Sequence, residues 1–243
     1  MIGKQVIDEA ELGRFLDAHD VGHWETDTEV GAEKLVEVAG RLCYMSFAKP
    51  RPGGNAAYIE HILEVGHGSV LEHAVFSLLI TGVSRSLTHE LIRHRAGMSY
   101  SQLSQRYVDE SDCNFVLPPG IAIGTPVYDS WVYQCRDSAY LYKFAAEHLE
   151  SSFVDIPDKT ARRKAAREAA RSILPNCTET KIVVTGNARA WRHFLELRGS
   201  EHADAEIRRL ARAVLETLQA AAPNLFGDYT VQNGCISTPS KKV

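Results

Sequence analysis

The stretch "AVFSLLITGVSRSLTHELIRHRAG", Ala74 to Gly97, joins an apolar run directly to a polar one. Its first part, Ala74 to Val83, is apolar and rich in strand-forming residues at its centre, which predicts a buried strand. Ser84 can then cap a helix that runs through "SLTHELIRHR", and Gly97 breaks that helix. A strand that leads straight into a helix, within a chain of mostly helical segments, favours an α+β fold.

Working outward, apolar periodicity predicts helices over "ELGRFLDAH", "AEKLVEVAGRLCY" and "NAAYIEHILEVGHG", the last with Asn55 as its N-cap and Gly66 near its end. Longer helices are expected over residues 126–151, over "DKTARRKAAREAARSIL" with Asp158 near its start, and over "EHADAEIRRLARAVLETLQAAA". Residues 114–117 and "KIVVTGN" are expected to be strands, and Asn187 caps the helix "ARAWRHFLELR". We therefore predict a single domain over residues 1–235, with several long helices, a small mostly antiparallel sheet and a frayed tail over residues 236–243.

Composition excludes several classes of protein. The 243 residues are 44% hydrophobic and 24% charged, as in soluble globular proteins, and the net charge of −4 argues against non-specific binding of nucleic acid. The longest apolar run, Ala74 to Val83, is about half of a membrane span. Five cysteines, none in a C-x-x-C pair, argue against a disulfide framework or a zinc knuckle. We expect a cytoplasmic protein that binds neither membrane nor nucleic acid.

Arginines and hydroxyls gather in "RHRAGMSYSQLSQRY", Arg93 to Tyr107. Arg93 and Arg95 end the predicted helix, and Arg106 follows a loop of polar side chains, Ser99, Ser101, Gln102 and Ser104. A guanidinium is a planar fork that can grip a phosphate or a carboxylate through two hydrogen bonds. The pattern suits a phosphorylated ligand; the alternative is a solvated charged turn.

Two other stretches have two interpretations each: a ligand site, or an ordinary structural role. In "GHGSVLEH", residues 66–73, the glycines around His67 permit close approach of a flat ligand, or Gly66 simply ends a helix. In "TGNARAWRHFLELR", residues 185–198, an Asn cap followed by basic residues can meet an anion at a helix N-terminus. Alternatively this helix is amphipathic, with Trp191 and Phe194 in the core; the position of its arginines stays open.

Other catalytic motifs are absent from the sequence. It has neither a phosphate loop of the G-x-x-x-x-G-K-[ST] type, nor G-x-G-x-x-G, nor G-x-S-x-G. "HELIRH" is similar to the zincin pattern H-E-x-x-H, but its second histidine comes one position late. Five residues on a helix turn by about 500°, so His89 and His94 would point roughly 140° apart. That spacing argues against a shared zinc ion.

Taken in order, these stretches resemble the flavin-dependent thymidylate synthases, the ThyX family. The resemblance rests on "RHRAGMSYSQLSQRY", "GHGSVLEH", "VSRS" before "THELIRHR", "LPNCTETKIVVTGNARAWRHFLELR" and "SEHADAEIRRLA", and it spans about Leu35 to Phe226. It implies a ThyX-like α+β fold and a methyltransferase that converts dUMP to dTMP. In that reaction methylenetetrahydrofolate is the carbon donor, FAD the redox carrier and NADPH the reductant, and no cysteine acts as nucleophile. It also implies a homotetramer whose active sites lie at subunit interfaces.

The resemblance further implies which residues bind each ligand, and it implies no metal site. The residues expected to contact dUMP are Glu90, Leu91, Ile92, Arg93, Gln102, Leu103, Ser104, Gln105, Arg106, Arg171 and Arg198. The residues expected to contact FAD are His67, Ser69, Arg93, His94, Arg95, Gln102, Asn187, Ala188, Arg189 and His193. Arg198 is expected to be catalytic, because a fixed cation over the uracil favours ionisation of its ring N–H.

One feature departs from the family pattern. Eight residues, 96–103, separate Arg95 from Ser104, which is one more than is usual in the family. We expect Gly97 to absorb the extra residue as a bulge before Ser99. Two alternatives to the synthase remain: a nucleotide- or flavin-binding module without turnover, and a metal hydrolase that uses His89, Glu90 and His94.

Overall fold

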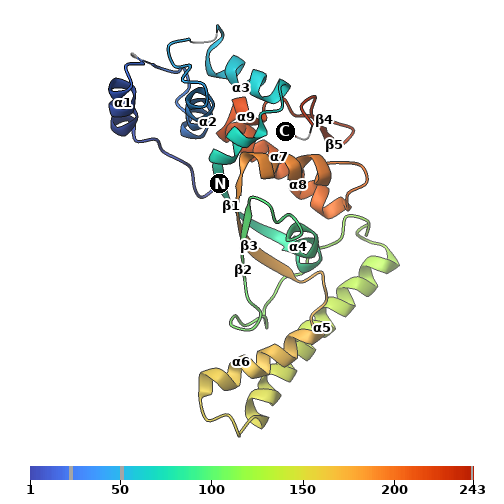
Figure 1. The fold of residues 1–243 in the computed structure, drawn as a ribbon. Helices are drawn as coiled ribbons and strands as arrows, with labels where there is room; N and C mark the ends of the chain where they lie inside the picture. The colour runs from blue at the N-terminus through green and yellow to red at the C-terminus, as the bar shows by residue number, and fades with distance from the viewer. Residues whose placement is uncertain (22–23, 50–51, 242) are drawn as a thin grey trace. The chain divides into compact units, whose positions relative to one another are not determined.

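The computed structural model describes residues 1–21, 24–49, 52–241 and 243. They form two compact units (Figure 1). Unit 1 comprises Met1–Leu79, His94–Tyr100 and Val184–Val243, and unit 2 comprises Ile80–Arg93 and Ser101–Val183. The domain boundaries expected from the sequence stay a prediction.

The long helices lie where the sequence predicts them, whereas α4 ends earlier than predicted. Unit 1 contains α1 (Glu9–Ala18), α2 (Gly31–Leu42), α3 (Gly54–Glu64), the 3₁₀ helix η1 (Gly68–His73), α7 (Ala188–Arg198), α8 (Ala205–Ala221) and α9 (Pro223–Phe226). Unit 2 contains α4 (Arg85–Leu91), α5 (Pro126–Ser152), α6 (Lys159–Ala170) and the 3₁₀ helix η2 (Arg171–Ile173). Among the residues described, no helix is both long and apolar enough to span a membrane.

A small antiparallel sheet completes the α+β fold and confirms the predicted class. Its strands are β1 (Val75–Ser84), β2 (Met98–Gln102) and β3 (Glu179–Asn187), in the order β1-β3-β2, and each of them changes unit partway along its length. Asn187 N–H donates to the Gly97 carbonyl at 3.1 Å, and Leu103 N–H donates to the Lys181 carbonyl at 2.9 Å. Because residue numbers rise along β2 as they fall along β3, these two strands are antiparallel.

Unit 1 is built around α7 and α8. Trp191, Phe194 and Leu195 of α7 are completely buried, and the Trp191 indole N–H donates to the Phe76 carbonyl of β1 at 3.4 Å. On α8 the buried residues recur at helical spacing: Ile207, Leu210, Ala211, Val214, Leu215 and Leu218. The prediction that Trp191 and Phe194 lie in the core is therefore confirmed.

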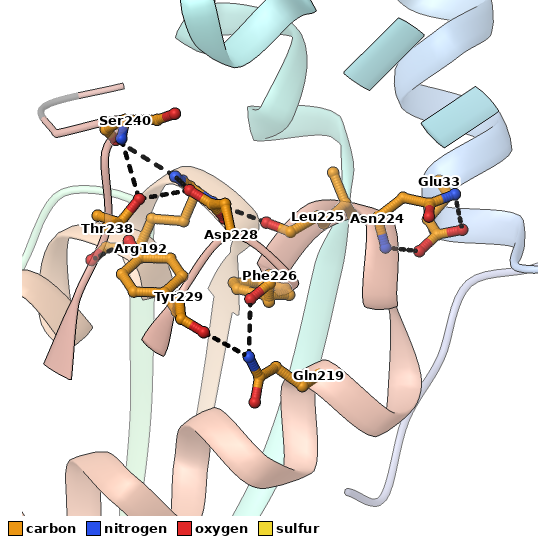
Figure 2. A network of polar contacts seen from close by, with 10 residues as sticks. All are labelled: Glu33, Arg192, Gln219, Asn224, Leu225, Phe226, Asp228, Tyr229, Thr238 and Ser240. Atoms are coloured by element: carbon orange, nitrogen blue, oxygen red, sulfur yellow. Dashed lines mark hydrogen bonds and ion pairs between the residues drawn. The ribbon is translucent and has the colours of Figure 1, made fainter. Parts of the chain in front are cut away.

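Arg192 settles the position of an arginine that the sequence leaves open. Its side chain is completely buried, and two nitrogens donate to the two carboxylate oxygens of Asp228, each at 2.7 Å (Figure 2). The carbonyls of Leu225 and Ser240 accept further bonds at 2.8 and 3.3 Å. The guanidinium also lies 4.7 Å from the centre of the Tyr229 ring. This network fastens the segment after α8 to α7.

The C-terminal tail differs from the frayed end expected from the sequence. Strands β4 (Thr230–Gln232) and β5 (Cys235–Ser237) pair as an antiparallel ribbon. Ile236 is buried and its N–H donates to the Gly199 carbonyl at 2.9 Å, while Thr238 is buried and donates to Asp228. These contacts hold the tail because they satisfy its backbone and a buried carboxylate.

Two local expectations are wrong. Asn55 is not the N-cap of α3: Gly53 takes that position with φ of +94°, and Asn55 is buried two residues later, as the second residue of the helix. Its amide donates to the Glu37 carboxylate at 2.8 Å, so the side chain serves helix packing instead. Residues 114–117 form only a single bridge, Phe115 to Thr178, because the following prolines cannot donate to a strand ladder.

In unit 2, α5 and α6 lie side by side as a helical hairpin (Figure 1). Thr125 caps α5 and Asp158 caps α6 through side-chain oxygens that accept from Tyr128 N–H and Ala161 N–H. Along the 27 residues of α5 the buried ones are Cys135, Ser138 and Tyr142. Most side chains of α5 are therefore not buried within this chain.

The buried ion pair predicts a large loss of stability in Asp228→Ala. Removal of this carboxylate leaves the Arg192 charge buried without compensation, so we expect the free energy of unfolding to fall by about 3–5 kcal/mol. Urea unfolding followed by circular dichroism measures it. The matched control is Arg14→Ala, which removes an exposed pair with Glu11 and should cost less than about 1 kcal/mol. Equal losses in the two variants would show that the buried pair contributes little.

Candidate functional site

The R-H-R sequence does not lie on one helix, contrary to the sequence prediction. Helix α4, capped by Ser84 as predicted, ends at Leu91, and Arg93 N–H closes the last turn on the Glu90 carbonyl at 3.2 Å. The residues that follow form a turn into β2. Because β2 pairs with β3, its backbone groups are not available to extend the helix. His94 and Arg95 therefore belong to unit 1, whereas Arg93 belongs to unit 2.

The loop 94–100 is closed on itself and attached to the start of α7. Met98 N–H donates to the Arg95 carbonyl at 3.3 Å, so Ala96 and Gly97 form the tip of a turn. Gly97 has φ of +70°, the left-handed conformation, and an added Cβ would lie 2.7 Å from the Asn187 amide nitrogen. The stretch with the extra residue thus turns at Gly97, where only glycine fits without strain.

His94 is a buried neutral imidazole that orients Arg198. Arg198 Nε donates to His94 Nε2 at 2.9 Å, and the ring packs edge-on against Phe194 at 5.3 Å. Burial, with the nearby positive charge of Arg198 and the ring of His193, lowers the pKa of His94 to about 4. Because Nε2 accepts, the ring proton of the neutral form is on Nδ1. The histidine thus positions a cation without neutralising it.

A cavity of about 530 Å³ opens beside the start of α7, and we call its surroundings the α7 cluster. It is lined by Glu72, Ala96, Gly97, Asn187, Arg189, Ala190, His193, Glu196 and Val243. The structure therefore brings together three residues of the predicted FAD set, Asn187, Arg189 and His193. The Asn187 side-chain oxygen accepts from Ala190 N–H at 2.8 Å, which confirms the predicted cap. At this helix start the Ala188 N–H is also bonded, to the Ala74 carbonyl, and the cavity lining carries both Arg189 and the carboxylates of Glu72 and Glu196.

The predicted residues around His67 also belong to this neighbourhood. Gly66 has φ of +72°, as expected for the end of α3, and Gly68 begins η1. A Cβ on Gly68 would lie 3.0 Å from Arg189 Nε, so the segment that carries His67 and Ser69 lies against Arg189. Arg189 itself pairs with Glu72 at 2.7 Å, half exposed. Ala188 is fully buried and contributes its N–H to the Ala74 carbonyl.

The predicted dUMP residues other than Arg198, which belongs to α7 of unit 1, lie in unit 2 along α4, β2 and the end of α6, and we call them the α4–β2 cluster. Gln102 is anchored between two elements, because its amide donates to Thr88 of α4 at 3.1 Å and to Thr180 of β3 at 3.2 Å. Ser104 accepts from Arg106 N–H at 3.4 Å within a tight turn. Leu91 is completely buried, whereas Ile92 and Arg93 are exposed. The cluster thus mixes supporting residues with accessible ones.

Three arginines of unit 2, Arg85, Arg106 and Arg171, are connected with the end of α6 by an ion pair and an electrostatic interaction. Arg106 Nε pairs with Glu168 of α6 at 2.7 Å, and Arg171 follows Glu168 one turn later. Arg85, half-buried, donates to the Leu103 carbonyl at 3.5 Å. Burial lowers the pKa of Arg85, the charge of Arg171 lowers it further, and Glu110 opposes both. Such a group of cations matches a phosphate.

Arg85 is a functional candidate that the sequence reasoning missed. The arginine stands in "VSRS", directly after the Ser84 cap, and that block was noted only as part of the family pattern. The sequence offered one signal: Arg85 is a cation at the first helical position, directly after a buried strand. A side chain at that position starts from the end of the strand. Gln105, by contrast, belongs to the predicted dUMP set: it is buried, and its amide nitrogen has no hydrogen-bond partner among the described residues.

No group of three or more His, Cys, Asp or Glu side chains is arranged for a metal ion within the described part of the chain. Helix α4 ends before His94, so His89 and His94 do not lie on the same helix, and the angle expected between them does not apply. The site chemistry is instead that of guanidiniums, amides and imidazoles. This set suits an enzyme that holds phosphorylated nucleotides.

Comparison with known proteins identifies the family. Residues 26–224 match the family model described as thymidylate synthase complementing protein. The chain is 56% identical over 211 residues to a flavin-dependent thymidylate synthase of Mycobacteroides abscessus, covering 86% of this chain and 83% of that protein. It is 53% identical over 219 residues to that of Mycobacterium avium, covering 89% and 86% of the two chains. The chain belongs to the flavin-dependent thymidylate synthase family.

The contact of Gly97 with Asn187 predicts that Gly97→Ala is more harmful than conformation alone explains. Left-handed backbone costs an alanine about 1–2 kcal/mol, and the new Cβ also collides with the cap of α7, so we expect a total loss of about 2–4 kcal/mol. Thermal and urea unfolding measure it. Gly66→Ala is the matched control, because it has nearly the same φ but nothing within 4 Å of the added Cβ. Indistinguishable losses would mean that the contact with Asn187 yields freely.

The lowered pKa of His94 predicts a pH-dependent stability. In the unfolded chain the imidazole takes a proton below about pH 6.5, whereas the native ring stays neutral down to about 4. Unfolding therefore binds a proton in this window, and stability that is complete above pH 6.5 is lost as the pH falls toward 4. His94→Asn should reduce the loss between pH 7 and 5 by on the order of 1 kcal/mol in urea unfolding. The exposed His202→Asn is the control and should leave the pH dependence unchanged.

Proposed function

We propose that this chain methylates dUMP to dTMP, with methylenetetrahydrofolate as carbon donor, FAD as redox carrier and NADPH as reductant. The observation that carries the proposal is the group of arginines associated with the end of α6: Arg106 pairs with Glu168, and the charge of Arg171 acts on Arg85. A nucleoside monophosphate carries the dianion that such a cluster fits, and Ser104 and Gln105 lie in the same segment as Arg106. The α4–β2 cluster is thus the dUMP site.

The α7 cluster is the FAD site in this proposal. Its residues fit a dinucleotide, because the helix start and Arg189 offer hydrogen bonds and positive charge to a pyrophosphate. Gly68 and Gly97 allow their segments to pack closely against Arg189 and Asn187, which holds both segments beside the start of α7. When bound, the flavin supplies the hydride chemistry. The protein contributes binding, orientation and exclusion of water through His67, Ser69, His94, Arg95, Asn187 and His193.

Arg198 is the catalytic residue of the proposed reaction. Its guanidinium stabilises negative charge on the uracil ring when the ring N–H loses its proton. His94 accepts from Arg198 Nε and so fixes its direction while adding no charge of its own. Such an arrangement needs no cysteine nucleophile, in keeping with the unpatterned positions of the cysteines.

The active form is proposed to be a cytoplasmic homotetramer with shared active sites. Helix α5 exposes large apolar side chains, Val127, Tyr133, Tyr140 and Phe144. An exposed apolar face of this kind supports burial against another chain. All five cysteines are free thiols, as suits a reducing compartment.

The test is NADPH oxidation by the purified protein supplied with FAD, with and without dUMP. We expect dUMP to stimulate oxidation, and dTMP to form when methylenetetrahydrofolate is added. Arg198→Ala should lower dTMP formation by about 10²–10³-fold while flavin absorbance stays with the protein. Arg209→Ala, an exposed arginine on α8, is the matched control and should keep full activity.

Each failure has a distinct meaning. Bound flavin with no NADPH oxidation, with or without dUMP, would favour a binding module without turnover. Absence of bound flavin would refute the assignment of the α7 cluster. Loss of flavin in Arg198→Ala would show that Arg198 serves the cofactor and not the pyrimidine.

A further inference from the structure

Two thiols in unit 2 lie in contact and take no part in the proposed reaction. Cys135 Sγ of α5 lies 3.7 Å from Cys177 Sγ, which belongs to the segment just before β3. Cys135 is only 5% exposed, and Cys177 is partly exposed. A disulfide has sulfur atoms about 2.05 Å apart, so the pair must approach by roughly 1.7 Å to bond. Side-chain rotation within such a contact covers a distance of this order.

The backbone around Cys177 is held firmly. The Cys177 carbonyl accepts from Val116 N–H at 2.8 Å, and the Thr178 carbonyl accepts from Arg85 N–H at 3.0 Å. On the other side, Cys135 is one of the few buried residues of α5 and lies near its middle. The two sulfur atoms are therefore presented to each other by elements fixed independently.

We propose that Cys135 and Cys177 form a site of reversible oxidation that closes to a disulfide when a hydroperoxide is present. The hydroperoxide first transfers an oxygen atom to the more accessible Cys177, giving a sulfenic acid and, from hydrogen peroxide, one molecule of water. The Cys135 sulfur then attacks the Cys177 sulfur. The S–O bond breaks, the oxygen leaves with the thiol proton as a second molecule of water, and the S–S bond forms. A dithiol reductant reverses the reaction.

The environment of the thiols sets the rate. Burial, and then the neighbouring Cys177, raise the pKa of Cys135 to about 12. Burial likewise raises the pKa of Cys113, a third cysteine of this region, to about 11. Because the thiolate is the attacking form, closure is slow at neutral pH and accelerates as the pH rises. The pair is therefore reduced under ordinary conditions and responds to sustained oxidation.

The disulfide would close a covalent loop that contains the whole of α6, including its C-terminal end near the α4–β2 cluster. The closed loop runs from residue 135 to residue 177 and contains Glu168 and Arg171 of the α4–β2 cluster. A cross-link stabilises mainly by restricting the unfolded chain, and it does so more for a loop of this length than for a short one. Oxidation thus fastens α5 to the segment before β3 without a change in the native fold.

The experiment treats the purified, FAD-supplied full chain with hydrogen peroxide at neutral and at alkaline pH. We expect the loss of two hydrogen atoms in intact mass and a Cys135–Cys177 peptide in a non-reducing digest, both reversed by dithiothreitol. We also expect a rise in Tm of about 5 °C or more. Cys113→Ser should oxidise as the natural chain does, whereas Cys177→Ser should show neither the mass loss nor the rise in Tm.

Several results would overturn the proposal. One is stable sulfinic acid on Cys177 with no disulfide, and another is a Cys113–Cys177 disulfide in the digest. A disulfide that forms but lowers Tm would show that the bond distorts the native fold, contrary to the proposal. The digest of the natural chain decides the pairing even if the Cys177→Ser variant fails to fold.

Discussion

The buried guanidinium of Arg192 requires a counter-charge, because an arginine cannot give up its proton and water cannot reach it. Asp228 supplies that charge, and to place it the chain after α8 must turn back through α9 onto α7. The Tyr229 hydroxyl then donates to the Arg192 carbonyl at 3.1 Å, which ties the same segment to the helix backbone. Helix α7 is thereby fixed along its length, and the positions of Asn187, His193 and Arg198 follow from that helix.

The loop 94–100 depends on this fixed helix in turn. Its Gly97 carbonyl accepts from Asn187 N–H, and His94 accepts from Arg198, so both ends of α7 hold it. The imidazole stays neutral because burial and an adjacent cation both oppose protonation. The buried ion pair of Arg192 thus fixes α7, and α7 carries Arg198, the proposed catalytic residue, whose guanidinium donates to the neutral His94.

Local rules in the sequence predicted much of this fold. The caps at Ser84, Asp158 and Asn187 follow from short-range chemistry, and so does the core position of Trp191. The early end of α4 could not be predicted, since a non-local ladder with β3 decides it. The burial of Arg192 was equally hidden, because its partner lies 36 residues away. Arg85 escaped notice because neither its half-burial nor its proximity to Arg171 can be read from spacing.

If the α4–β2 cluster is the proposed anion site, its carboxylates bear on how an acidic chain could hold an anion. Two of its cations interact with carboxylates: Arg106 pairs with Glu168, and Arg85 interacts electrostatically with Glu110. The pair of Arg106 with Glu168 is half exposed on both sides, so it contributes less than about 1 kcal/mol and breaks readily. A phosphate that displaces Glu168 gains charge-assisted bonds to several guanidiniums at once. Glu168 therefore holds Arg106 near the end of α6 while leaving it available to a stronger anion.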